Sequence, residues 1–177
     1  MKTLNAVLAG FGGQGILFAG KVIAYCGLVE ERQVSWLPSY GPEMRGGTAN
    51  CSVCLADEPI GSPLVVQPDV LIAMNNPSYD KFIDAVRPGG IAIVDSTLID
   101  RKCDREDIAV HYVPATRLAD EQNLKGLANI ILIGKMLAET EFASADAVEK
   151  AIAKCVPPSK QHLIDANLRA IELGKNQ

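Results

Sequence analysis

The N-terminal segment restricts the fold more than any other part of the sequence. Residues 3–9 form a short apolar run, which predicts a strand buried on both faces. From Gln14 to about Leu28, apolar residues and glycines recur three and four apart, which predicts a helix packed closely on a sheet. A glycine-rich turn separates the two segments. This succession of strand, glycine turn and helix is typical of α/β proteins.

The rest of the chain repeats the alternation of apolar strands and helices. Further strands are predicted at 33–37, 48–57, 69–74, 91–94 and 108–113, with a loop at 38–47 and a helix at 77–86. Helices are predicted at 115–121, 127–138, 145–154 and 161–173. We expect Trp36 in a strand core and the apolar helix 127–138 packed on the sheet or on another subunit. The pattern predicts one α/β domain over residues 1–177, Rossmann-like and doubly wound, with a mostly parallel sheet and a helical C-terminal third.

The composition argues against several classes of protein. Seventeen Lys and Arg against twenty-one Asp and Glu give a net charge of −4 without a basic run, so nucleic acid is not an expected partner. The longest apolar stretches, such as residues 130–133, are far shorter than the roughly 20 residues of a membrane span. No secretory leader pattern follows Lys2, and five irregularly spaced cysteines suit reduced thiols. We expect a cytoplasmic protein without a membrane span or a structural disulfide.

The glycine turn, Gly-Phe-Gly-Gly-Gln-Gly at 10–15, has the spacing of a dinucleotide-binding turn. Glycines let the backbone approach an anion, and the start of a helix favours phosphate. NAD binding also needs an acidic residue at the tip of the second strand, where this sequence has Leu-Pro-Ser at 37–39. Three interpretations stay open: dinucleotide binding, contact with a phosphate or coenzyme tail, and a tight packing turn.

A second loop, Ser-Tyr-Gly-Pro-Glu-Met-Arg-Gly-Gly-Thr at 39–48, follows the second predicted strand. In a parallel sheet it would start from the same carboxyl edge as the glycine turn, where α/β proteins bind ligands. Arg45 could clamp a phosphate or carboxylate, or form an ion pair with Glu43 or across a subunit interface. Tyr40 and Met44 suit a surface for a partner protein.

Together the two loops resemble a known family. The segments Gly-Phe-Gly-Gly-Gln-Gly-Ile at 10–16 and Pro-Ser-Tyr-Gly-Pro-Glu-Met-Arg-Gly-Gly-Thr-Ala-Asn at 38–50 are similar to the gamma subunit of 2-oxoacid:ferredoxin oxidoreductases. The similarity continues through Asn-Asn-Pro-Ser at 75–78 and Pro-Gly-Gly at 88–90. The sequence of residues 44–50 is most similar to the 2-oxoglutarate branch of this family, with the indolepyruvate and branched-chain 2-oxoacid complexes as alternatives.

The resemblance implies a subunit of a complex that oxidatively decarboxylates a 2-oxoacid with coenzyme A and reduces ferredoxin. It places thiamine diphosphate, Mg²⁺ and the iron–sulfur clusters on partner chains, namely thiamine-binding alpha and beta subunits and a ferredoxin-like delta subunit. No cofactor is assigned to this chain alone, and coenzyme A is a co-substrate of the complex. A stand-alone nucleotide-binding module and a purely structural assembly subunit remain rival interpretations, and self-association of the isolated chain stays open.

No catalytic residue and no metal ligand is predicted in this chain. Cys51 and Cys54 are three apart in a predicted strand and so point to opposite faces, while His111 and His162 lack partners for catalysis. The segment 95–97 is interpreted as a turn held by side chain to backbone hydrogen bonds. The candidate wall of the active site or coenzyme A site comprises Gly10, Gly12, Gly13, Gln14, Gly15 and Arg45. The candidate interface comprises Ser39, Tyr40, Gly41, Pro42, Glu43, Met44, Gly46, Gly47, Thr48 and Asn75.

Overall fold

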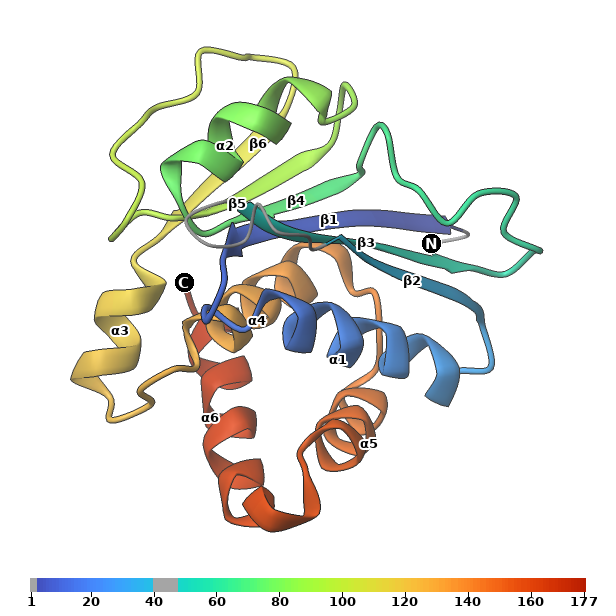
Figure 1. Ribbon diagram of the computed structural model, residues 1–177, viewed down its shortest axis with the longest axis vertical. Coiled ribbons are helices and arrows are strands. Elements are labelled where there is room, and N and C mark those ends of the chain that lie inside the picture. Colours follow the sequence, from blue (N-terminus) through green and yellow to red (C-terminus); the bar gives the residue numbers. More distant parts are fainter. Residues whose placement is uncertain (1–2, 40–47) are drawn as a thin grey trace.

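The computed structural model describes residues 3–39 and 48–177 of the chain. Its strands are β1 (Thr3–Phe11), β2 (Gln33–Ser39), β3 (Thr48–Ala56), β4 (Val70–Ala73), β5 (Ile91–Asp95) and β6 (Ala109–Val113). Its α-helices are α1 (Ile16–Val29), α2 (Asn76–Phe82), α3 (Ala115–Glu121), α4 (Ala128–Thr140), α5 (Ala145–Cys155) and α6 (Ile164–Lys175). The sheet lies between α2 on one face and α1 with the C-terminal helices on the other (Figure 1). This arrangement is the expected Rossmann-like, doubly wound α/β fold.

The strands of the described sheet lie in the order β2-β3-β1-β4-β5-β6. β1, β4, β5 and β6 are parallel neighbours, whereas β3 runs antiparallel to both β1 and β2. Only eight residues separate β2 from β3, and a parallel connection needs a crossover of about a dozen residues or more. The mostly parallel sheet predicted from the sequence is confirmed, with β3 as its antiparallel strand.

Two apolar cores lie on the two faces of the sheet. Alternate residues of β1 divide between them, since Ala6 and Leu8 face α1 and α4 whereas Val7 faces α2. The larger core joins β1 and β3 to the C-terminal helices, and the smaller core joins β4 and β5 to α2. The prediction that the first strand is buried on both faces is therefore confirmed.

Helix α4 is buried on nearly all sides, as the strongly apolar middle of its sequence predicts. It packs on the sheet with Ile130 to Ile133 and on α6 along a close helix–helix crossing. At that crossing Gly134 faces Gly174, and a Cβ atom on Gly134 would lie 2.1 Å from the carbonyl oxygen of Ile171. The expected packing of this helix on the sheet is thus confirmed, and α6 of the same chain also packs against it.

Strand β2 is the edge of the sheet and differs from its prediction. It continues through Pro38 to Ser39, which pairs with Asn50, so the loop does not begin at Pro38 as predicted. Trp36 is 37% exposed because an edge strand has a neighbour on one side only, and its assignment to a strand core was wrong. The predicted helix at 161–173 begins instead as a 3-10 helix, η3 (Pro158–Leu163), before α6.

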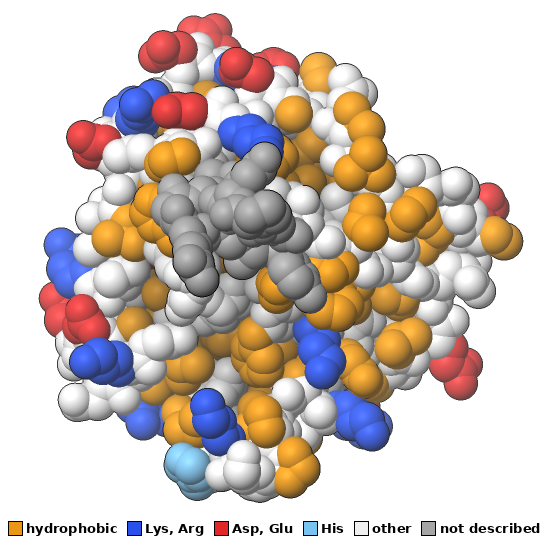
Figure 2. Space-filling view, in the orientation of Figure 1, with side chains coloured by type: hydrophobic (Ala, Val, Ile, Leu, Met, Phe, Trp, Pro, Cys, Tyr) orange, Lys and Arg blue, Asp and Glu red, His pale blue; other side chains and the backbone are white. Residues whose placement is uncertain are grey.

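The surface is uneven in charge. Figure 2 shows the molecule in the orientation of Figure 1, with acidic side chains crowded at the top, over α2 and the adjoining loops. Lys and Arg are the commoner charged side chains over the helices below the sheet.

Within the described ranges, no helix combines the length and apolar character that crossing a bilayer requires.

Candidate functional site

The glycine turn joins β1 to α1 at the carboxyl edge of the parallel strands. Gly13 and Gly15 adopt φ angles of +92° and +72°, in the left-handed region that favours glycine. Gly10 packs closely on Gln14, because a Cβ atom there would lie 2.5 Å from Oε1 of Gln14 and would displace that side chain. Gly12 is exposed between them. Backbone conformation and close packing therefore account for three of the four glycines.

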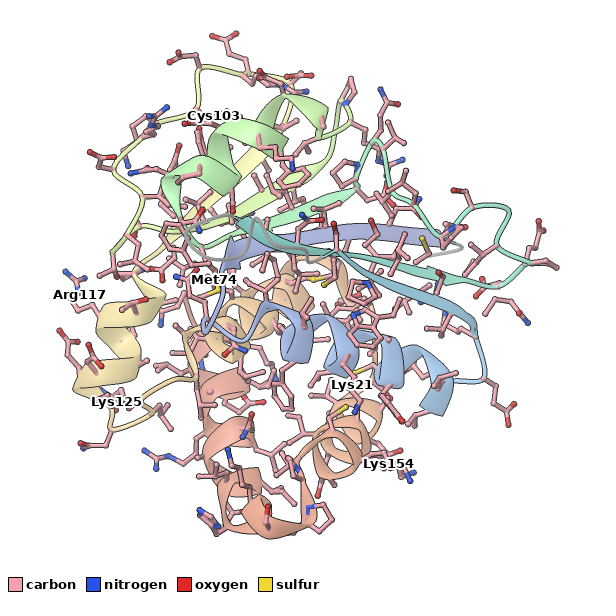
Figure 3. All side chains as sticks on the ribbon, viewed as in Figure 1. Lys21, Met74, Cys103, Arg117, Lys125 and Lys154 are labelled. Atoms are coloured by element: carbon pink, nitrogen blue, oxygen red, sulfur yellow. The ribbon has the colours of Figure 1, made fainter. Side chains whose placement is uncertain are left out.

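The side chain of Gln14 closes the turn from within. Its Oε1 atom accepts a hydrogen bond from the backbone N–H of Phe11 at 2.6 Å, and its Nε2 atom donates to the carbonyl of Met74 at 2.9 Å. Met74, labelled in Figure 3, follows β4. Gln14 therefore ties the turn to the neighbouring strand. The N–H of Phe11 is consequently not offered to a bound anion. This arrangement favours the packing-turn interpretation.

The strand order argues separately against a dinucleotide site of the NAD type. Such a site needs an acidic residue at the tip of the strand beside β1, where the ribose lies. Here β3 occupies that place and β2 lies one strand further, roughly 10 Å from β1. The tip of β2 carries Leu37, Pro38 and Ser39, none of which is acidic. The glycine spacing of this turn therefore does not indicate an NAD site.

The flanks of the second loop lie beside the glycine turn. β2 runs in the direction of β1, so Ser39 lies at the carboxyl edge, and Thr48 opens β3 opposite Phe11. The shared starting edge of the two loops is thus confirmed for these flanks. The loop residues themselves lie outside the described residues, namely Tyr40, Gly41, Pro42, Glu43, Met44, Arg45, Gly46 and Gly47.

Two buried polar side chains organise the rest of this edge. Asn75, after β4, caps α2 by accepting a hydrogen bond from the N–H of Ser78 at 2.8 Å. Asp95, fully buried at the end of β5, accepts from the N–H of Thr97 at 3.1 Å. It also accepts from Thr116 through the N–H at 3.3 Å and the hydroxyl at 2.6 Å. Asp95 forms the predicted turn and also fastens the start of α3 to the sheet.

A cavity of about 230 Å³ opens between these elements at the carboxyl edge. Its lining includes the glycine turn, the end of β4 and the start of α3, through Gly13, Gln14, Met74 and Thr116. Ligands of open α/β sheets bind in a crevice at this edge, next to the strand where the order reverses. Two of the candidate wall residues of the turn, Gly13 and Gln14, therefore border this cavity.

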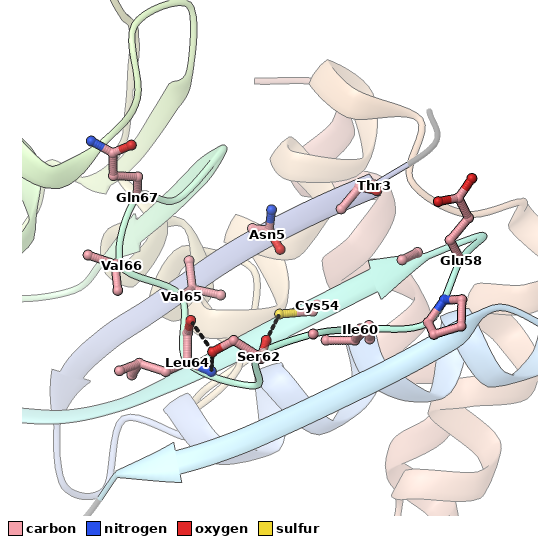
Figure 4. A pocket seen from close by; sticks show the side chains of 13 residues that line it. Thr3, Asn5, Cys54, Glu58, Ile60, Ser62, Leu64, Val65, Val66 and Gln67 are labelled. Carbon is pink, nitrogen blue, oxygen red and sulfur yellow. Dashed lines mark hydrogen bonds between the residues drawn. The ribbon is translucent and has the colours of Figure 1, made fainter.

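A larger cavity, about 350 Å³, lies at the opposite end of β1 and β3. Its walls are the start of β1, the end of β3 and the segment from Glu58 to Gln67, with Ser62 hydrogen-bonded to Leu64 and Cys54 to Ser62 (Figure 4). It is remote from the glycine turn and from the second loop, so its size does not make it part of the candidate site.

The five cysteines are free thiols in the structure. Cys51 donates to the carbonyl of Ile16 on the α1 side, and Cys54 faces the segment after β3, so the predicted opposite orientation is confirmed. Burial raises the pKa of Cys26 and Cys51 to about 12 and that of Cys155 to about 11. Burial, aided by the charge of Asp69, also raises the pKa of Cys54. Among the described residues, no cluster of three His, Cys, Asp or Glu side chains could hold a metal ion.

Cysteine labelling of the native protein is expected to select one residue. Cys103 is half-buried on the loop above α2, whereas the other four thiols are buried and three have pKa values far above 8 (Figure 3). Because the thiolate is the reactive form, an aromatic disulfide reagent at pH 8 should modify one thiol quickly and four only after denaturation. Cys103→Ser should abolish the fast phase and Cys155→Ser should leave it intact. Rapid modification of a second thiol would contradict this description.

Sequence reasoning missed one residue that supports the glycine turn. Asn129, at the start of α4, is buried, and its Nδ2 atom donates to the carbonyl of Gly15 at 2.9 Å. Its amide group also lies where a Cβ atom on Gly15 would need to be. The available signal was a single Asn at the head of an otherwise apolar helix. Such a residue needs hydrogen-bond partners when buried.

Comparison with known proteins agrees with this geometry. Residues 5–177 match the family described as Pyruvate ferredoxin/flavodoxin oxidoreductase. The chain belongs to this family. Both loops that carry the sequence resemblance fall within the matched residues.

The names of relatives within the family refer to different 2-oxoacids. A ketoisovalerate oxidoreductase subunit VorA of Methanothermobacter thermautotrophicus is 40% identical over 94% of this chain, and the match covers 35% of that subunit. A 2-oxoglutarate synthase subunit KorC of Methanocaldococcus jannaschii is 36% identical over 94% of this chain and 89% of its own length. The chain thus spans about a third of the VorA subunits and most of KorC.

Solved structures of the family share the fold. The gamma subunit of a keto/oxoacid ferredoxin oxidoreductase from Geobacter sulfurreducens is 28% identical, with a TM-score of 0.84 over 98% of this chain and 96% of that one. A 2-oxoglutarate:ferredoxin oxidoreductase chain from Magnetococcus marinus has a TM-score of 0.87 over 99% of this chain and 31% of its own length. At 23% identity, that second likeness concerns the fold alone.

Proposed function

We propose that this chain is the gamma subunit of a 2-oxoglutarate:ferredoxin oxidoreductase, which converts the oxoacid and coenzyme A to an acyl-CoA, CO₂ and reduced ferredoxin. The observation that carries the proposal is the match to 2-oxoglutarate synthase subunits KorC along nearly their whole length. Its partners are thiamine-binding alpha and beta subunits and a ferredoxin-like delta subunit. Thiamine diphosphate, Mg²⁺ and the iron–sulfur clusters reside on those partners.

In this complex the carboxyl edge of the sheet forms one wall of the reaction site. The glycine turn is rigid, because Gln14 holds it to β4 and Asn129 holds it to α4. A rigid wall excludes water from the reacting groups, which strengthens electrostatic contacts and keeps the coenzyme thiol oriented. A subunit without catalytic side chains can affect the rate in this way.

A second candidate is a branched-chain 2-oxoacid complex. The ketoisovalerate oxidoreductase subunits VorA are 40% identical to this chain, which exceeds the identity to the KorC subunits. The VorA subunits are about three times as long, so their remaining two thirds have no counterpart in this comparison.

Purification of the tagged chain under anaerobic conditions separates these candidates. The recovered complex is assayed for coenzyme A-dependent dye reduction with 2-oxoglutarate, 2-oxoisovalerate, indolepyruvate and pyruvate. Highest kcat/KM for 2-oxoglutarate supports the proposal, and highest kcat/KM for 2-oxoisovalerate supports the second candidate. A chain that recovers no thiamine-binding partner and no activity would overturn both.

Arg45 is the residue expected to contact coenzyme A from this chain. A guanidinium on a glycine-framed loop suits a phosphate, and loss of one charge-assisted hydrogen bond costs about 1.5–3 kcal/mol. Arg45→Ala in the assembled complex should therefore raise the apparent KM for coenzyme A by about 10-fold or more. Lys154→Ala, on α5, is the control and should leave that KM unchanged. Equal KM values for Arg45→Ala and the unmodified complex would remove Arg45 from the site.

A further inference from the structure

A further cavity lies on the helical side of the glycine turn. Its volume is about 280 Å³, close to the lower end of the roughly 300–1,000 Å³ of small-molecule pockets. Three parts of the chain form it: the start of α1, the start of α4, and the connection from α5 through η3 into α6. This size suits one ring or branched aliphatic group with a short polar end.

Most of the cavity wall is apolar. Phe18, Leu127, Leu163, Val156 and Pro157 all line it. The first three of these side chains are half-buried, so part of their apolar surface is open to a ligand. Removing such surface from water favours binding. The wall therefore selects a ligand with an apolar body.

The two carboxamides of the lining do not select the ligand by hydrogen bonding. Asn129 is 3% exposed, and its Nδ2 atom donates to the carbonyl of Gly15 at 2.9 Å. Asn167 is 2% exposed, and its Nδ2 atom donates to the carbonyl of Leu163 at 2.8 Å. The Oδ1 atoms of both are enclosed by the protein. These residues fix the shape of the wall and leave the charge of the lining to decide the polar end of the ligand.

The charge of the lining is positive. Lys160 is the charged residue of the described lining, is exposed, and forms no ion pair within residues 3–39 and 48–177. An unpaired cation beside apolar surface attracts an anion, and no carboxylate of the described lining competes for it. One lysine matches one negative charge, whereas a phosphate monoester carries about −1.5 to −2 at pH 7. A carboxylate fits this lining best.

The starts of two helices add to the attraction of Lys160. Gly15 and Leu127, the N-cap residues of α1 and α4, both line the cavity. Neither helix has a side-chain cap or an acidic residue in its first turn, so the positive end of each is not neutralised locally. α6 also begins here, with Leu163, but Asp165 in its first turn offsets its positive end.

We propose that this cavity binds a small carboxylate with an apolar body, such as an aryl or branched-chain acid. The ring or branched group packs against Phe18, Leu127 and Leu163, and the carboxylate faces Lys160 at the rim. The apolar wall and the single unpaired lysine carry this proposal, and the two helix starts support the sign of the charge. Every residue of the described lining belongs to this chain, so no partner subunit is needed for binding.

An NMR titration of the purified chain with phenylacetate, phenylacetamide and acetate tests the proposal. Phenylacetamide keeps the shape without the charge, and acetate keeps the charge without the ring. Phenylacetate should bind about 5- to 30-fold more tightly than phenylacetamide and about 10-fold or more tightly than acetate. The backbone amide resonances of Phe18, Leu127 and Lys160 should shift most. Equal binding of phenylacetate and phenylacetamide, or no shift at these residues with millimolar phenylacetate, would overturn the proposal.

A matched pair of variants assigns the effect to the cavity. Lys160→Gln removes the charge, so the affinity for phenylacetate should fall to that for phenylacetamide while the affinity for phenylacetamide stays unchanged. Lys154→Gln is the control, because Lys154 is also exposed and forms no ion pair with the described residues, but lies on α5 outside the lining. It should leave both affinities unchanged. A Lys160→Gln variant that still prefers phenylacetate would contradict the assignment to this cavity.

Competition distinguishes two sources of such an acid. 2-Oxoisovalerate and isovalerate share a branched body and differ in the keto group. Displacement of phenylacetate by 2-oxoisovalerate alone assigns the cavity to a 2-oxoacid, and equal displacement by both assigns it to apolar carboxylates in general. The titrations use no partner subunit and no coenzyme A, so their failure would leave the proposed function unaffected.

Discussion

Gly134→Ala is expected to lower the free energy of unfolding by about 3 kcal/mol or more. The added methyl group would meet the carbonyl oxygen of Ile171 at 2.1 Å, which backbone atoms of two packed helices cannot avoid by rotating a side chain. Overpacking a core typically costs about 1–3 kcal/mol and sometimes more. In a helix, alanine is more favourable than glycine by about 1 kcal/mol. A net loss of stability would therefore show that the steric overlap at the crossing of α4 and α6 outweighs this gain in helix propensity.

Urea denaturation followed by circular dichroism measures this loss. Gly61→Ala is the control, because a Cβ atom there meets nothing within 4 Å, and its effect should stay within about 0.5 kcal/mol. A Gly134→Ala variant as stable as the unmodified chain would mean that α4 and α6 are farther apart than described.

Asp95→Ala is expected to cost about 3 kcal/mol. The carboxylate accepts three hydrogen bonds, from the N–H groups of Thr97 and Thr116 and from the hydroxyl of Thr116, and it is fully buried. Each donor that loses its partner in a buried site costs about 1–3 kcal/mol, less where water can reach it. Because Thr116 begins α3, the loss should also loosen the wall of the carboxyl-edge cavity.

Hydrogen exchange at Thr116, together with urea denaturation, separates these two effects. Asp95→Asn keeps one acceptor and should cost less than Asp95→Ala. Asp100→Ala removes an exposed carboxylate on the same loop and should change stability by less than about 0.5 kcal/mol. Unchanged exchange at Thr116 in Asp95→Ala would show that this carboxylate does not hold α3.

Most elements of the fold could be predicted from periodicity. Apolar residues recur three and four apart in the helices and form short continuous runs in the buried strands. The direction of β3 was missed, although the eight residues between β2 and β3 are too few for the crossover that a parallel pair needs. The exposure of Trp36 was also missed, because whether a strand lies at the edge depends on pairing between distant segments. The partner of α4 was open for the same reason, as Gly174 lies 40 residues after Gly134.

The candidate site was predictable in position but not in its inner contacts. The glycine spacing located the turn at the carboxyl edge, yet nothing in that spacing indicates that the side chain of Gln14 fills it. Likewise, the hydrogen bond from Asn129 to Gly15 joins residues 114 apart in sequence. Polar contacts of this kind depend on the final placement of helices, which local patterns do not encode.

The proline in β2 limits how far the sheet can extend. β2 exposes apolar side chains of Trp36 and Leu37 at an open edge, which in other proteins invites a strand from a second molecule. Pro38 has no N–H, so an added strand would leave a carbonyl oxygen without its donor at that position. Backbone pairing of a second molecule with β2 is consequently disfavoured at Pro38, so the ladder that an added strand could form along this edge is interrupted there.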